Sequence, residues 1–302
     1  MGERTGISWT DHTFNPWIGC QKVSPGCANC YAEELVRTRM KRDFRVVLRS
    51  KDWSEPRRWQ KRAAAAGRQE LVFSCSISDF FIEEADAWRP EVWQLIRETP
   101  NLTWQLLTKR VERLEPCLPP DWDDGYPNVW LGASVENQLM ADRRLPVLLD
   151  IPARLHFVSA EPLLGRLDLT RYLQATCAEN LGWVIVGGES GPDFRPMEWS
   201  WARSLLSQCA KASVPFFGKQ QSGRRNELLL QILPSGAELK EFPRDWRPEL
   251  ACGECGRRDP RALPLTFYPF ERAGRPWGSW LCHFCLALHR PGRARGQQEL
   301  VP

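Results

Sequence analysis

The sequence of 302 residues contains few histidines, tyrosines and methionines, with four of each. It also lacks an apolar run long enough to span a membrane, and the N-terminal residues MGERTG do not lead into the apolar core of a secretory signal peptide. These absences predict a cytoplasmic protein with no membrane partner. Because histidine is scarce and no nucleophile–histidine–acid set is recognisable, an ordinary barrel hydrolase ranks last among the enzyme classes considered.

Neither sign of charge is in large excess, since 41 Lys and Arg against 37 Asp and Glu give a formal net charge of +4. This mild excess permits contact with nucleic acid without indicating it. The apolar content of 42% is enough for a core, and most of the 15 tryptophans should be buried there or in a pocket. The length suits one large domain, alone or with a small second domain.

Cysteine, in contrast, is abundant. A cytosolic chain with 11 cysteines more often uses them for metal or redox chemistry than for disulfides. Seven of them form two clusters, one of Cys20, Cys27 and Cys30 and one of Cys252, Cys255, Cys282 and Cys285. The other four stand alone and are interpreted as small buried apolar residues: Cys75, Cys117, Cys177 and Cys209.

Short, nearly continuous apolar runs recur along the chain, and such runs are typical of strands buried on both faces of a parallel sheet. They cover residues 71–76, 103–108, 129–134, 155–160, 183–188 and 214–219, with earlier candidates within 7–18 and 44–48. Segments with helical spacing lie between them, which indicates strand–helix–strand units. The predicted fold is α/β, a full or partial TIM-like (β/α) barrel. An open doubly wound sheet is the alternative, although no glycine-rich phosphate turn follows the first strand.

The residues that directly follow these predicted strands are polar or charged. In parallel α/β folds such positions line the working face, so they are candidates for catalysis or substrate binding. The candidates for catalysis are Lys109, Glu136, Asn137 and Lys219. Asp79 is a candidate for orienting a cationic group, and Arg110, with Lys109, for binding a carboxylate or phosphate. Helix N-capping is the competing explanation for part of this set.

Near the C-terminus, two CxxC pairs are separated by 26 residues, and the segments between them look like the strands of a small hairpin. Their four thiolates, from Cys252, Cys255, Cys282 and Cys285, can hold one Zn²⁺ tetrahedrally with no open coordination position, which predicts a structural zinc ribbon. The predicted domains are a barrel over 1–222, an extension over 223–250, the zinc-ribbon module over 251–290 and a basic tail over 291–302.

The N-terminal cluster has the pattern C-x6-C-x2-C, which supplies three thiolates and lacks a fourth. Three thiolates can hold three irons of a [4Fe–4S] cluster and leave the fourth iron open to a small molecule. A helix predicted over residues 29–42 begins beside the site, and its N-terminal dipole favours the negative thiolates. Zinc held by the same three thiols and either His12 or Asp11 is the alternative that the spacing leaves open.

The chain contains, in this order between residues 7 and 221, the motifs WTDHTFNPWIGCQKVSPGCANCYAE, LLTKR, NVWLGASVEN, FVSAEPLLG, WVIVGGESG and VPFFGKQ. Together they resemble the phage-associated family of three-cysteine-motif proteins, which are radical-SAM-like and of unknown substrate. The resemblance does not cover the zinc module, which looks like an addition. It implies a [4Fe–4S] cluster on the three N-terminal cysteines, with S-adenosylmethionine on the open iron.

The resemblance also implies an element of two glycines and a glutamate that holds the methionyl amino group. GGES, with Gly187, Gly188 and Glu189, is similar to one version of this element, and SAEPLL, with Glu161, is similar to another. We therefore expect either Glu161 or Glu189 to contact the cofactor. The sequence does not decide between them.

The leading hypothesis is an enzyme that generates a 5′-deoxyadenosyl radical and uses it on an unknown substrate, with nucleic acid or a nucleotide as one candidate. Its expected cofactors are a [4Fe–4S] cluster, S-adenosylmethionine and Zn²⁺. It needs an electron donor, and DNA, RNA and a separate partner protein remain open as partners. The alternative is a non-enzymatic nucleic-acid-binding protein with two structural zinc sites.

Overall fold

The computed structural model describes residues 5–173, 180–224 and 239–243, together with two strands further on. Its α-helices are α1 (Tyr31–Leu35), α2 (Glu55–Ala65), α3 (Arg89–Arg97), α4 (Leu114–Cys117), α5 (Gln138–Leu149), α6 (Thr170–Leu173) and α7 (Trp199–Ala212). Its strands are β1 (His12–Phe14), β2 (Trp17–Ile18), β3 (Leu48–Arg49), β4 (Glu70–Ser74), β5 (Leu102–Thr108), β6 (Val129–Ser134), β7 (Leu155–Ala160), β8 (Leu181–Gly187), β9 (Phe216–Gln220), β10 (Thr266–Arg272) and β11 (Arg275–Leu281). The shorter helical turns are η1 (Pro25–Cys27), η3 (Glu83–Ala85), η4 (Val111–Arg113) and the π-helical η2 (Val36–Met40).

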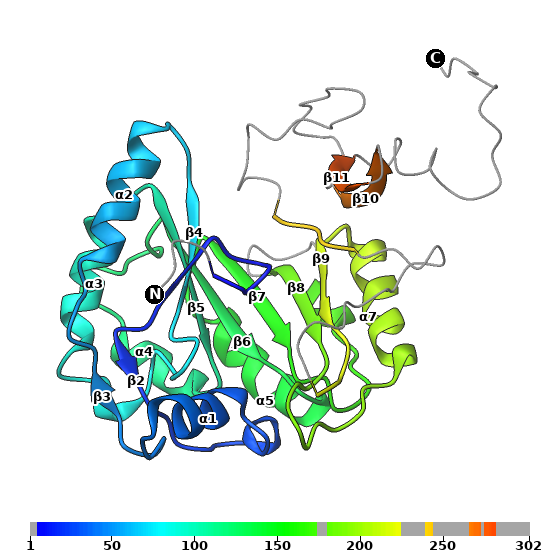
Figure 1. The fold of residues 1–302 in the computed structure, drawn as a ribbon, viewed down its shortest axis with the longest axis horizontal. Coiled ribbons are helices and arrows are strands. Elements are labelled where there is room, and N and C mark those ends of the chain that lie inside the picture. Colours follow the sequence, from blue (N-terminus) through cyan, green and yellow to red (C-terminus); the bar gives the residue numbers. More distant parts are fainter. Residues whose placement is uncertain (1–4, 174–179, 225–238, 244–265, 273–274, 282–302) are drawn as a thin grey trace.

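Seven strands form one parallel sheet in the order β1-β4-β5-β6-β7-β8-β9. The sheet curls into a half barrel with β1 and β9 at its edges, and these two strands do not pair with each other within the described residues (Figure 1). Figure 1 also shows α2 and α3 on the β4 side and α7 on the β9 side. The α/β class and the partial barrel are therefore confirmed, and the six main apolar runs form consecutive strands.

One of the two earlier strand candidates joins this sheet. β1 pairs in parallel with β4, whereas β3 pairs antiparallel with β2 in a separate two-stranded sheet. The chain before β3 is instead attached to the N-terminal cysteine loop, because the Cys20 N–H donates to the Phe44 carbonyl at 2.8 Å. Residues 44–48 are therefore not a strand of the barrel.

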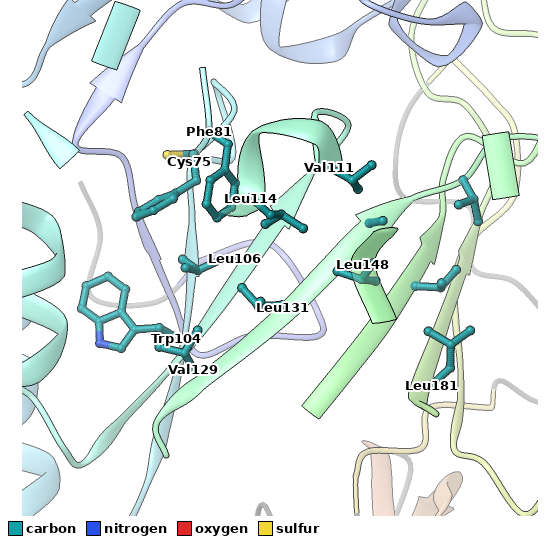
Figure 2. Close-up of a cluster of buried hydrophobic side chains, with 14 of the residues drawn as sticks. Cys75, Phe81, Trp104, Leu106, Val111, Leu114, Val129, Leu131, Leu148 and Leu181 are labelled. Carbon is teal, nitrogen blue, oxygen red and sulfur yellow. The ribbon is translucent and has the colours of Figure 1, made fainter. Parts of the chain in front are cut away.

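The main hydrophobic core lies between the sheet and the helices on its convex face. Figure 2 shows Trp104 and Leu106 of β5 beside Val129 and Leu131 of β6 in this core. Every residue of β6 is buried, which agrees with strands that are covered on both faces. Three of the isolated cysteines are also buried, namely Cys75, Cys117 and Cys209, while Cys177 lies outside the described residues.

Aromatic rings fill the concave face near the amino ends of the strands. These rings belong to Trp9, Trp130, Phe157, Trp183 and Phe217. Gly132 makes room for them, because a Cβ atom at this position would lie 2.4 Å from Cζ of Phe157. The carboxyl-terminal half of the concave face is left to polar side chains, and the candidate site is found there.

Residues 239–243, which the sequence places in the extension after the barrel, pack on the edge of the sheet. The Gly218 N–H donates to the Leu239 carbonyl at 2.7 Å, and the Glu241 N–H donates to the Phe216 carbonyl at 3.0 Å. These bonds give β9 a partner on the side away from β8. The folded unit therefore includes a piece of chain beyond β9.

β10 and β11 pair as an antiparallel hairpin. The four cysteines of the predicted zinc ribbon, Cys252, Cys255, Cys282 and Cys285, lie outside the described residues. The predicted basic tail over 291–302 lies outside them as well. Across the described part of the chain, no helix combines the length and the apolar character needed to cross a membrane.

Candidate functional site

A pocket opens at the carboxyl ends of the strands, on the concave side of the half barrel. Its empty volume, which includes space open to solvent, is about 1090 Å³. Trp9 and Phe73 form part of its lining, next to the aromatic cluster. Ten residues that the sequence proposed for the site line this pocket together: Cys20, Cys27, Cys30, Asp79, Lys109, Arg110, Glu161, Gly188, Glu189 and Lys219. The fold thus brings loops that are far apart in the sequence to one place.

The three N-terminal cysteines lie on a loop at this pocket. Cys20 follows β2, Cys27 is the last residue of η1 and Cys30 directly precedes α1. All three are free thiols with partly exposed side chains. The helix predicted after them is present as α1 continued by η2, and Figure 1 shows α1 at the end of the sheet where this pocket lies.

Glu136 anchors the cysteine loop to the sheet. Its Oε1 accepts a hydrogen bond from the Gly26 N–H at 3.0 Å, and its Oε2 accepts one from Arg144 Nη1 at 2.8 Å. Glu136 is 0% exposed. Burial raises the pKa of Glu136, but the Ser24 hydrogen bond, the Arg144 charge and the Gly26 N–H favour the carboxylate more strongly, so the pKa lies below its ordinary value. Glu136 is therefore a structural anchor for the turn that contains Cys27.

Glu189 anchors the same loop from another side. Its Oε2 accepts hydrogen bonds from Asn29 Nδ2 at 3.0 Å and from the Arg195 backbone N–H at 2.8 Å. Arg195 Nη2 also donates to the Pro25 carbonyl at 3.0 Å. Burial raises the pKa of Glu189, but the hydrogen bonds from Arg195 and Asn29 outweigh it and hold the pKa below its ordinary value. The residues on both sides of Cys27 are thereby fixed.

Cys20 lies beside a buried ion pair. Arg110 Nη1 is 3.5 Å from Cys20 Sγ and 3.3 Å from Asp79 Oδ2. Arg110 Nη2 donates to the Gln21 carbonyl at 2.7 Å, and Asp79 accepts a hydrogen bond from Thr108 Oγ1 at 2.7 Å. Burial raises the pKa of Cys20 to about 12, with the Asp79 charge adding to the shift and the Arg110 guanidinium opposing it. Burial therefore favours the neutral thiol of Cys20 over its thiolate near neutral pH.

Glu161 and Lys219 form an ion pair in the pocket, and each side chain is 18% exposed, so a ligand can reach both charges. Gly187 lies against this pair, since a Cβ atom there would be 3.2 Å from Glu161 Cδ. Lys109 Nζ donates to Ser134 Oγ at 3.1 Å nearby. Unlike the two buried glutamates, these groups do not hold the cysteine loop.

Two other sequence candidates have local structural roles. Asn137 is the N-cap of α5, where its Oδ1 accepts a hydrogen bond from the Met140 N–H at 3.0 Å. Gly188 allows the chain after β9 to approach, because a Cβ atom there would lie 2.2 Å from the Ser222 nitrogen. N-capping, the competing explanation in the sequence, thus describes Asn137.

Sequence reasoning missed the arginines that hold the two buried glutamates. Glu136 precedes α5 and Arg144 lies within it, so no helical spacing in the sequence marks the pair. Arg195 lies in an irregular segment six residues after Glu189, where no periodicity marks it. Both arginines act by fixing a carboxylate under the cysteine loop.

Within the described residues, the three thiols are not grouped with other side chains as the ligands of one metal ion. Among the residues that the structure describes, no three His, Cys, Asp or Glu side chains are grouped closely enough to hold one metal ion. A [4Fe–4S] cluster takes one thiolate on each of three irons, so its ligands do not converge on one point. His12, a fourth ligand suggested for zinc, instead contacts Glu70 at 2.7 Å and stacks on Trp59. Asp11, the other suggestion, accepts a hydrogen bond from the Leu71 N–H at 2.9 Å.

These features define a class of protein, an α/β half barrel with a charged pocket at the carboxyl ends of its strands and three free thiols beside it. Residues 4–250 match the family described as "Protein of unknown function (DUF5131)", and the chain belongs to this family. The match includes the whole half barrel and the packed residues 239–243, and it ends before the predicted zinc ribbon. No curated protein and no solved structure matches the chain.

Proposed function

We propose that this protein is a radical S-adenosylmethionine enzyme with a [4Fe–4S] cluster on Cys20, Cys27 and Cys30. The observation that carries the proposal is that these free thiols share one pocket with the accessible Glu161–Lys219 ion pair, at the carboxyl ends of a parallel half barrel. When bound and reduced by an external donor, such a cluster supplies the electron that splits S-adenosylmethionine into methionine and a 5′-deoxyadenosyl radical, which takes a hydrogen atom from the substrate.

The ion pair in the pocket suits the methionyl end of the cofactor, which carries an ammonium and a carboxylate. Glu161 binds the ammonium and Lys219 binds the carboxylate, so one internal ion pair is exchanged for two charge-assisted contacts. Glu189 is less suited to this task, because Asn29 and Arg195 already occupy its carboxylate. We therefore assign the methionyl group to Glu161.

The anchored loop and the aromatic floor suit the same chemistry. Glu136 and Glu189 restrict the cysteine loop from two sides, which holds the thiols in a fixed arrangement before any ligand binds. Trp9 and Phe73 give the base of the pocket an apolar surface. Excluding water there protects a reactive intermediate from side reactions.

The test is metal analysis of the full-length protein purified without oxygen, with the wild type beside Cys27→Ala. We expect about four irons per chain and broad visible absorption in the wild type, and loss of the iron in the variant. Cys209→Ala is the matched control, because it removes a buried thiol on α7 that does not line the pocket, and it should keep its iron. Release of 5′-deoxyadenosine from S-adenosylmethionine is then expected from the reduced wild type and absent from Cys27→Ala.

The metal content also separates the two hypotheses. The wild type should also hold one zinc ion on its C-terminal cysteines. The Cys282→Ser variant should lose this zinc and keep its iron. Two zinc ions and no iron in the wild type, even after anaerobic reconstitution, would overturn the proposal. That result would favour the alternative, a nucleic-acid-binding protein with two structural zinc sites.

A further inference from the structure

Residues 36–51 run from η2 to β3 beside the cysteine loop, and we name this segment the basic rim. It holds seven basic residues and one acidic residue, a net charge of +6, whereas the whole chain carries +4. The basic residues are Arg37, Arg39, Lys41, Arg42, Arg45, Arg49 and Lys51, and all of them are exposed. The rest of the chain is therefore slightly acidic, and the positive charge is concentrated here.

Much of this charge is not neutralised. Three of the cations have acidic partners, in the pairs Arg37–Glu34, Arg45–Asp43 and Arg49–Glu91. The other four form no ion pair with any described residue: Arg39, Lys41, Arg42 and Lys51. A row of unpaired cations creates a positive potential that attracts a polyanion.

Exposed apolar side chains lie in and next to the same segment. Of the seven large apolar side chains that are exposed among the described residues, five fall between residues 23 and 48. These five are Val23, Tyr31, Met40, Val46 and Leu48. Cations interleaved with apolar and aromatic side chains are typical of surfaces that bind single-stranded nucleic acid, where phosphates meet cations and bases pack on rings.

The basic rim is attached directly to the pocket. Phe44, in the middle of the segment, is buried and lines the pocket, and its carbonyl accepts the Cys20 N–H. The Tyr31 hydroxyl donates to the Ser76 carbonyl at 2.5 Å, which fixes the ring at the pocket entrance. Tyr31 also lines a wider groove outside the pocket, together with Met40. A ligand that lies on the rim therefore reaches the pocket entrance.

The half barrel leaves this entrance open to a polymer. The outer groove has an empty volume of about 2710 Å³, including space open to solvent, and it shares Cys30, Tyr31, Ser76 and Lys219 with the pocket. A closed barrel would admit a ligand only through its end, whereas an open sheet lets a long chain lie across the site without threading.

We propose that the basic rim binds the phosphate backbone of a single-stranded nucleic acid and presents one nucleotide to the pocket. Arg39, Lys41 and Arg42 contact phosphates, and Tyr31 and Met40 contact bases. This inference rests on the proposed function for the fate of that nucleotide, because it names the substrate class of the same pocket. The binding surface itself does not require the cluster. An anionic membrane is the competing ligand for a basic and apolar segment, but Arg37 and Arg39 of the rim line the concave outer groove, which a flat bilayer does not enter.

The test measures fluorescence anisotropy of a labelled single-stranded DNA of about 20 nucleotides, which is longer than the site of one strand-binding domain. The full-length wild type is compared with the triple variant Arg39→Gln/Lys41→Gln/Arg42→Gln over a range of salt concentrations. Each lost phosphate contact reduces the slope of log affinity against log salt by about 0.7, so the triple variant should lose about 2 from the slope. At about 0.1 M salt its affinity should fall about 100-fold.

The matched control is Arg143→Gln/Arg203→Gln/Lys211→Gln, which removes two arginines and one lysine from the exposed surfaces of α5 and α7. It should bind as the wild type does, and both variants should keep the wild-type melting temperature because the altered side chains are exposed. Equal binding by the triple variant, or an equal loss in the control, would refute the inference. So would binding of the wild type to vesicles of phosphatidylcholine and phosphatidylserine in place of the oligonucleotide.

The Cys27→Ala protein distinguishes this inference from the proposed function. It lacks the proposed cluster but keeps the whole basic rim, so it should bind the oligonucleotide with wild-type affinity. If the wild type contains iron but does not bind the oligonucleotide, this inference is wrong and the proposed function is unaffected. If the wild type binds the oligonucleotide but contains no iron, only the proposed function is wrong.

Discussion

Three glutamates beside the cysteine loop differ in what surrounds them, and their partners indicate their roles. Glu136 and Glu189 are buried and hold the loop through Gly26, Asn29 and an arginine each. Glu161 faces the pocket and has a lysine partner that a ligand can displace. A buried carboxylate with all its partners is costly to change, whereas an accessible one is free to bind.

Glu136→Gln should destabilise the fold. The variant leaves the buried Arg144 guanidinium without its counter-charge, and breaking a buried pair in this way costs about 3–5 kcal/mol. For a domain of this size we expect a melting temperature about 10 °C lower, measured by calorimetry at neutral pH. Glu112→Gln, at an exposed position, is the control and should melt as the wild type does.

The same variant should show a particular pH dependence. The pKa of Glu136 is lowered in the folded state, so its carboxylate stabilises the fold fully above the unfolded value of about 4.3. This contribution is lost as the pH falls through the lower folded value. The gap in melting temperature between the wild type and Glu136→Gln should therefore narrow below about pH 4. A gap that stays constant from neutral to strongly acidic pH would contradict this assignment.

Glu161→Gln should weaken S-adenosylmethionine binding while leaving the iron content unchanged. The loss of one charge-assisted hydrogen bond costs about 1.5–3 kcal/mol, or roughly 10- to 100-fold in affinity. Titration calorimetry on the iron-loaded protein under anaerobic conditions measures the affinity for S-adenosylmethionine. Glu189→Gln is the comparison, and it should reduce stability and iron content first, since Glu189 holds the cysteine loop. Wild-type affinity in Glu161→Gln would show that the methionyl group lies elsewhere.

At this scale the sequence could indicate which residues share the site but not what each one does. Lys109 and Lys219 could be found because they end or follow recognisable strands, and the structure places both in the pocket. Glu136 was grouped with them for the same reason. Its role depends on Gly26, which is 110 residues away in the sequence and meets it only in the folded chain.

At the scale of elements, the parallel strands were predictable because their burial on both faces leaves a continuous apolar signal. Residues 44–48 carry part of the same signal without being a barrel strand. There the apolar side chain of Phe44 packs with Ala32, Val36 and Ile77 beside the cysteine loop. Burial alone therefore does not distinguish a strand from a loop that covers a small core. Backbone hydrogen bonding with residues distant in the sequence determines which of the two forms.

Trp183→Ala in β8 should test the aromatic filling of the half barrel. The Trp183 ring is fully buried and lies 6.0 Å from the Phe157 ring and 5.9 Å from the Phe217 ring. Removing a core tryptophan costs about 3–5 kcal/mol, which corresponds to a melting temperature about 10 °C lower. The control is Leu139→Ala, at a side chain that is 71% exposed, which should change the melting temperature by less than about 2 °C. Similar melting of the two variants would mean that the cluster contributes little.

At the scale of the whole molecule, the sequence left open whether the barrel closes. Side-chain patterns record burial, but closure depends on backbone pairing between the first and last strands, and both a full and a partial barrel give the same apolar runs. The predicted barrel boundary at residue 222 also rests on side-chain patterns. Residues 239–243 contact β9 through backbone hydrogen bonds, and no periodicity in the sequence predicts such bonds.

A chain that ends after residue 224 should therefore associate or aggregate more than one that ends after residue 250. The shorter chain loses the bonds from Leu239 and Glu241 and exposes β9 as an unprotected edge. It also loses Phe242, whose ring lies 5.5 Å from that of Trp183. Size-exclusion chromatography of the two proteins is the measurement, and equal elution as monomers with equal melting temperatures would contradict it.

The late arrival of this cover matters while the protein is being made. β9 leaves the ribosome before Leu239 does, because Leu239 lies about 20 residues later along the chain. At ~5–20 residues per second, the edge of the nascent sheet stays bare for roughly one to four seconds. Neighbouring nascent chains on one messenger could exchange strands during that interval. Slower elongation while residues 221–238 emerge from the ribosome should lengthen it and lower the yield of correctly folded protein.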